Sequence, residues 1–90
     1  MEPGVGDKEL KRLRKRVDAI DLAIVKLLEK RWKAARGIGA VKKKQGVKYY
    51  DPKREREVIR NVTKKTTLGK GFIKRLFTEI MEHCRNGEAQ

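Results

Sequence analysis

Two basic residues lie on what would otherwise be the apolar side of a long helix. Apolar residues recur three or four positions apart from Leu10 to Leu27, a spacing typical of a helix that packs against other helices. Arg31 follows Leu27 by four residues, and Lys42 lies three helical turns beyond Arg31 on nearly the same side. A charge among packed side chains is costly unless an opposite charge meets it. The pair therefore predicts a small bound anion or, as a plainer alternative, ion pairs with neighbouring helices or side chains that extend into solvent. The apolar set, called the seam below, comprises Leu10, Leu13, Val17, Ile20, Ile24 and Leu27.

A second charged group follows a predicted turn. Asp51 precedes Pro52, the usual order of a helix N-cap and a first-turn proline, and Arg54 and Glu55 come soon after. Capping accounts for the two acidic residues, but a cation in the first turn opposes the helix dipole. Arg54 therefore has more reason to stand there if it binds an anion.

The third group, near the end of the chain, is less informative. Cys84 and Glu88 are four residues apart and share a helix face with Ile80 and Met81. A free cysteine is usually a small buried side chain, and a terminal glutamate is usually solvated. The spacing alone assigns neither residue a role.

Three helices are predicted to position these groups, with neither a strand pattern nor an internal repeat. Residues 1–7, rich in glycine, are expected to form a flexible lead-in to a domain of residues 8–90, with Asp7 able to cap the first helix. That helix is predicted from Lys8 to about Lys44, and Gly46 suits its C-terminus. The other two helices are predicted over about 52–65, with Val58, Ile59 and Val62 inside, and over about 71–86, with Phe72, Ile73, Leu76, Phe77, Ile80 and Met81 at helical spacing.

The length of the first helix predicts a second subunit. At 1.5 Å per residue it would be on the order of 55 Å long, whereas a compact domain of about 100 residues has a radius of gyration near 13 Å. A single small domain also buries only about 60% of the surface that its unfolded chain would expose. We therefore expect an all-α homodimer in which a second copy covers part of the helix.

The overall charge narrows the class of partner. The 90 residues include 25 Lys+Arg and 12 Asp+Glu, a net charge of +13, which suits either nucleic acid or a small anionic metabolite. A solvated surface, or a thermophilic source, is the plainer explanation for many of these charges. One cysteine allows neither an internal disulfide nor a cysteine-based metal cluster. No signal-like or membrane-spanning apolar run is seen, so a cytoplasmic location is expected.

Three sequence blocks, in order, resemble the all-helical chorismate mutase family. They are LRKRVDAIDLAIVKLLEKR at 13–31, continued by IGAVK up to Lys42; DPKRERE at 51–57; and RLFTEIMEHCR at 75–85. The resemblance covers almost the whole chain from Leu10 to Glu88. It implies an intertwined homodimer of three-helix chains that rearranges chorismate to prephenate without a cofactor or a metal.

The same resemblance implies roles for individual residues. Arg31 and Arg54 would hold substrate carboxylates, and Arg14 would reach another carboxylate from the partner subunit. Arg14 lies about a quarter-turn around the helix from Arg31, as expected if it serves the other site. Lys42 would contact the ether oxygen and a carboxylate. Acceptors for the ring hydroxyl would be Asp51 and Glu55, and the apolar walls would be Ile38, Val58 and Met81.

Two positions depart from the family pattern. Glu88 stands where most bacterial relatives have a glutamine that donates to the ether oxygen, and only a protonated carboxyl can donate in the same way. Turnover is therefore expected to fall as the pH rises and Glu88 loses its proton. Cys84 stands where many relatives have a substrate-binding serine, and a thiol is the weaker donor.

Two other functions compete with this interpretation. An isochorismate pyruvate-lyase would share the helical dimer and the anion site, although Glu55 and the linker length favour the mutase. A basic nucleic-acid-binding or adaptor protein would suit the net charge. It does not explain why Arg31 stands where the spacing of the seam predicts another apolar residue. Docking on another shikimate-pathway enzyme through exposed basic residues is left open.

Overall fold

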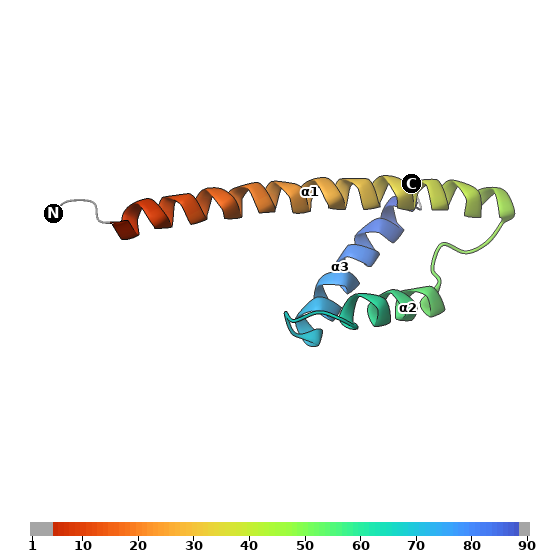
Figure 1. The fold of residues 1–90 in the computed structure, drawn as a ribbon. Coiled ribbons are helices and arrows are strands. Elements are labelled where there is room, and N and C mark those ends of the chain that lie inside the picture. Colours follow the sequence, from red (N-terminus) through yellow and green to blue (C-terminus); the bar gives the residue numbers. More distant parts are fainter. Residues whose placement is uncertain (1–4, 89–90) are drawn as a thin grey trace. The chain divides into compact units, whose positions relative to one another are not determined.

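Three α-helices make up the regular structure of the described part of the chain. The computed structural model describes the backbone of residues 5–88 and the side chains of residues 6–86. The helices are α1 (Val5–Gln45), α2 (Pro52–Thr63) and α3 (Lys70–Glu88), and no strand occurs among the described residues (Figure 1). The prediction of an all-α chain with a very long first helix is confirmed.

The ends of α1 are set by short local signals. The helix begins at Val5, three residues before the predicted start, so Asp7 lies in the first turn instead of capping it. A carboxylate in the first turn is favoured by the helix dipole. At the other end Gly46 has a φ of 69°, and the N–H groups of Gly46 and Val47 donate to the carbonyls of Lys43 and Lys42. This pair of bonds is a Schellman motif, and glycine adopts its left-handed conformation without strain.

The start of α2 fixes the position of the second charged group. Asp51 is the N-cap, and its Oδ1 accepts a hydrogen bond of 3.0 Å from the backbone N–H of Arg54. Pro52 follows as the first helical residue, as predicted. The helix ends at Thr63, two residues before the predicted end, and the Thr63 hydroxyl donates to the Ile59 carbonyl at 2.7 Å.

The chain divides into two units, the first ending at Lys30 and the second beginning at Arg31. All described side chains of the first unit are exposed in the single chain, including the whole seam, whose members are 41–63% exposed. The first unit therefore has no buried apolar side chain among its described residues.

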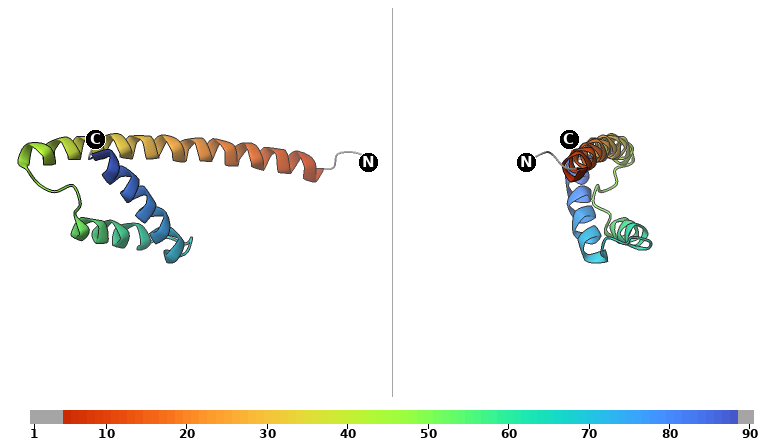
Figure 2. Two further views of the ribbon diagram at one scale, coloured as in Figure 1. Left: turned by 180° about the vertical axis from the view of Figure 1, so that it is seen from behind. Right: turned by 60° about the vertical axis from the view of Figure 1, so that its left-hand side comes forward.

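The second unit holds the rest of α1, the linker between α1 and α2, and the α2 and α3 helices. These two helices contact one another, and α3 runs from the end of α2 back to this part of α1 (Figures 1 and 2). The buried apolar side chains among the described residues all belong to this unit: Ala35, Ile73, Met81 and Cys84. None of the described helices is long and apolar enough to cross a membrane.

Candidate functional site

A pocket of about 460 Å³ lies within the second unit, where α1, the linker, α2 and α3 all contribute side chains. Nine of the eleven residues predicted for the site line it: Arg31, Ile38, Lys42, Asp51, Arg54, Glu55, Val58, Met81 and Cys84. Arg14 belongs to the first unit, where it is exposed. Glu88 is the last residue of α3, and its side chain lies outside the described residues.

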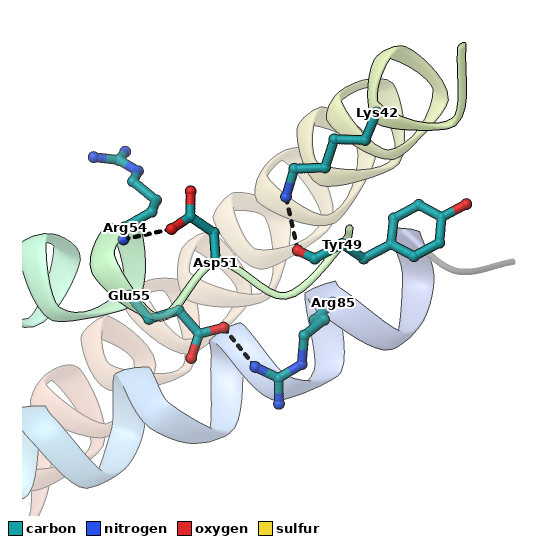
Figure 3. Close-up of polar contacts among 6 residues, drawn as sticks. All are labelled: Lys42, Tyr49, Asp51, Arg54, Glu55 and Arg85. Atoms are coloured by element: carbon teal, nitrogen blue, oxygen red, sulfur yellow. Dashed lines mark hydrogen bonds and ion pairs between the residues drawn. The ribbon is translucent and has the colours of Figure 1, made fainter. Parts of the chain in front are cut away.

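The α1 side of the pocket carries two cations and an apolar residue between them. Arg31 is half-buried, and its side chain has no hydrogen bond or ion pair to any residue that the structure describes. Lys42 is also half-buried, and its Nζ donates to the Tyr49 carbonyl oxygen at 2.7 Å (Figure 3). Ile38 between them is 52% exposed. The described residues therefore give Arg31 no ion pair with a neighbouring helix, which leaves a bound anion or extension into solvent.

The N-terminus of α2 brings the second charged group to the same pocket. Asp51 uses Oδ1 to cap the helix and leaves Oδ2 without a hydrogen bond among the described residues. The guanidinium of Arg54 points away from Asp51 in Figure 3 and pairs with Glu57 at 2.5 Å. Both partners of this pair are well exposed, so it is weak. Arg54 therefore lines the pocket with a guanidinium that can be redirected at little cost.

The α3 side combines apolar walls with a cation that the sequence did not reveal. Met81 and Cys84 are buried, and half-buried Val58 of α2 completes this wall. Arg85 lines the pocket as well, and its Nη1 donates to Glu55 Oε2 at 2.5 Å (Figure 3). Its guanidinium also stacks over the ring of Tyr50, with Cζ 4.5 Å from the ring centre.

Arg85 and Tyr49 were both missed at the level of sequence. Arg85 follows Met81 by four residues and so shares its helix face. Arg85 is thus a charge on an apolar helix face, as Arg31 is, and this pattern is visible in the sequence. Nothing in the sequence marks Tyr49, because it takes part through its backbone carbonyl.

The pocket's charges suit an anion that also carries a hydroxyl group. Among the described residues, the lining has four cations, Arg31, Lys42, Arg54 and Arg85, against two carboxylates, Asp51 and Glu55, a net charge of +2. Guanidinium groups bind carboxylates through paired hydrogen bonds, and carboxylates accept from hydroxyls. The buried wall of Met81 and Cys84 would exclude water from an apolar part of such a ligand.

Comparison with known proteins points to one family. The sequence model of the family described as "Chorismate mutase type II" matches residues 13–89. A chorismate mutase of Methanocaldococcus jannaschii is 29% identical over 79 residues, which cover 84% of this chain and 80% of that protein. A solved structure of a chorismate mutase from Thermus thermophilus matches with a TM-score of 0.88 at 31% identity, covering 91% of this chain and 96% of the other.

At least two similar proteins are much longer. The bifunctional chorismate mutase/prephenate dehydratase of Aquifex aeolicus is 36% identical over 83 residues, or 86% of this chain. Those residues cover 23% of the Aquifex protein, so the chain spans about a quarter of that relative's length.

Proposed function

Because this chain belongs to the type II chorismate mutase family, we propose that it rearranges chorismate to prephenate in the pocket described above. The observation that carries the proposal is the convergence of four cations and two carboxylates on one pocket of about 460 Å³ with a buried apolar wall. Chorismate offers the matching groups: two carboxylates, a ring hydroxyl and an apolar carbon frame.

The reaction is an intramolecular rearrangement. The ether C–O bond breaks while a new C–C bond forms between the enolpyruvyl arm and the ring, so no atom enters or leaves. The protein's residues therefore act by holding the arm over the ring and by stabilising the charge that develops on the ether oxygen. Arginines can fix that conformation by binding the two carboxylates of the substrate through paired hydrogen bonds.

Arg31 and Arg54 are proposed to hold these carboxylates from within one chain. Arg31 is half-buried, so its interaction with a carboxylate is only partly screened by water. Arg54 would exchange Glu57 for the substrate, and the exposure of that surface pair keeps the cost of the exchange small.

Lys42 and Glu88 are proposed to face the ether oxygen. The ammonium of Lys42 opposes the negative charge that grows on this oxygen as the bond breaks. Glu88 follows buried Cys84 by four residues, which places the two on the same face of α3. As a protonated acid, Glu88 would donate a hydrogen bond that an ionised carboxylate cannot donate.

The remaining pocket residues are proposed to select the substrate. Asp51 and Glu55 would hold the ring hydroxyl, and either could accept its one hydrogen through the oxygen not already used for capping or pairing. Ile38, Val58 and Met81 would contact the carbon frame. A role for Cys84 in binding would be limited to the weak hydrogen bond of a thiol.

The active form is proposed to be a homodimer in which the partner subunit supplies Arg14. A second copy would cover the seam, which is exposed in the single chain, and burial of its six apolar residues would drive association. Docking on another shikimate-pathway enzyme stays a prediction.

The direct test is a product assay with chorismate. Wild type should consume chorismate and release prephenate, and Arg31→Ala should lose on the order of 100-fold or more in kcat/KM, because a half-buried charged contact disappears. Arg31→Lys should recover part of this loss, and Lys33→Ala, which removes an exposed charge two residues away, serves as the matched control. If wild type left chorismate untouched but released pyruvate from isochorismate, the protein would be an isochorismate pyruvate-lyase and not a chorismate mutase.

A further inference from the structure

Arg85 is a residue of the pocket that the proposed mechanism does not use. It is half-buried, with 29% of its side chain exposed, and it bonds Glu55, which is 27% exposed. The bond joins α3 to α2 across 30 residues of sequence. A cation in this position neutralises one of the two carboxylates that line the pocket.

Arg85 also holds the linker between α1 and α2. Its guanidinium lies over the Tyr50 ring, 4.5 Å from the ring centre, and a cation stacked on an aromatic face is attracted by the ring's electrons. The neighbouring Tyr49 accepts the hydrogen bond from Lys42, and Asp51 follows as the N-cap of α2. One side chain thus fixes both Glu55 and the segment that leads to Asp51.

We propose that Arg85 is a positioning residue, which orients Glu55 so that its second oxygen receives the ring hydroxyl of the substrate; this rests on the function proposed above. Glu55 uses Oε2 for Arg85, and Oε1 accepts no hydrogen bond from the described residues. When one oxygen of a carboxylate is held by a hydrogen bond, the direction of the other oxygen is also fixed. The side chain therefore loses its entropy before the substrate binds, and binding does not include this cost.

The positive charge of Arg85 also favours binding of the substrate. Without it, Glu55 would lose the one positive partner that the described residues give it. Glu55 would then present an unpaired negative charge to a dianionic substrate. Loss of Arg85 is therefore expected to weaken substrate binding, seen as a higher KM, more than it slows the chemical step.

The test is a double-mutant cycle on chorismate turnover. Arg85→Gln should raise KM about 10-fold with a smaller change in kcat, the size expected for one half-buried charged hydrogen bond. In a Glu55→Gln background the same substitution should change KM less than about 2-fold, because no carboxylate remains to be oriented. Arg85→Lys should restore part of the wild-type KM, since it keeps the charge but not the planar stacking.

Lys74→Gln is the matched control, because it removes one exposed charge from the same helix. Circular dichroism of each variant separates a folding defect from a KM effect, and Arg85→Lys keeps the test open if Arg85→Gln unfolds. An equal KM change in both backgrounds, or an unchanged KM in folded Arg85→Gln, would overturn the positioning role while the mutase function stands. An inactive wild type would instead overturn the proposed function and this inference with it.

Discussion

Mixed dimers of two inactive variants should regain activity. Arg14→Ala and Arg31→Ala each remove one proposed carboxylate contact, but from different sites of the dimer if Arg14 serves the partner subunit. In a heterodimer of the two variants, one site then lacks both arginines and the other lacks neither. If both arginines served their own chain's site, every site in the heterodimer would lack one of them.

The size of the effect follows from counting sites. Each homodimer should retain on the order of 1% of wild-type kcat/KM or less, because both of its sites lack a guanidinium that is proposed to bind a substrate carboxylate. Random reassembly of equal amounts gives about half heterodimers, each with one intact site of two, so about a quarter of wild-type activity should return. That is a gain of at least about 25-fold over either variant alone.

The assay requires subunit exchange before the activity measurement. The two variants are unfolded together in guanidinium, refolded by dilution and assayed with chorismate, and the same protocol is applied to each variant alone as the control. Two different affinity tags allow the heterodimer to be isolated, and it should then have about half of wild-type activity. A purified heterodimer no more active than its parents would refute the assignment of Arg14 to the partner's site.

Two further predictions concern the seam and the end of α3. Ile20 is 54% exposed in the single chain, so covering it should contribute about 1 kcal/mol per subunit, and Ile20→Asp should raise the dimer dissociation constant at least about 30-fold. Sedimentation velocity would measure this, with Leu22→Asp on the opposite face as the control; equal effects of both substitutions would contradict the role of the seam. Glu88→Gln should keep its kcat as the pH rises while wild type loses activity, because an amide donates a hydrogen bond at every pH and a carboxylate does not. The same decline in both proteins would count against a protonated Glu88.

The helices could be predicted from the sequence because their signals are local. Asp51 and Pro52 mark the start of α2, and Gly46 marks the end of α1, each through contacts within five residues. The start of α1 was placed three residues late because Asp7 is acceptable both as a cap and in the first turn. Such ambiguity is usual at helix ends, where the first turn lacks hydrogen-bond partners for its N–H groups.

The pocket was only partly predictable, because some of its contacts join distant parts of the chain. Arg31 and Lys42 could be paired from helical spacing alone, and both line the pocket. The bond from Arg85 to Glu55 spans 30 residues and depends on how α3 meets α2, which no local pattern encodes. The family resemblance implies no role for Arg85 either, although the third matching block, residues 75–85, ends with it.

The exposed state of the first unit links folding to activity. Most helical stability in proteins comes from packing of an apolar face and not from intrinsic helix propensity. The described side chains up to Lys30 are all exposed in one chain, so their own chain provides no such packing. If a second copy covers the seam, the contact that stabilises this part of α1 also brings Arg14 to the partner's pocket. A free subunit would then lack both the packing of its first unit and one of the arginines of its site, so stability and turnover should depend together on subunit concentration.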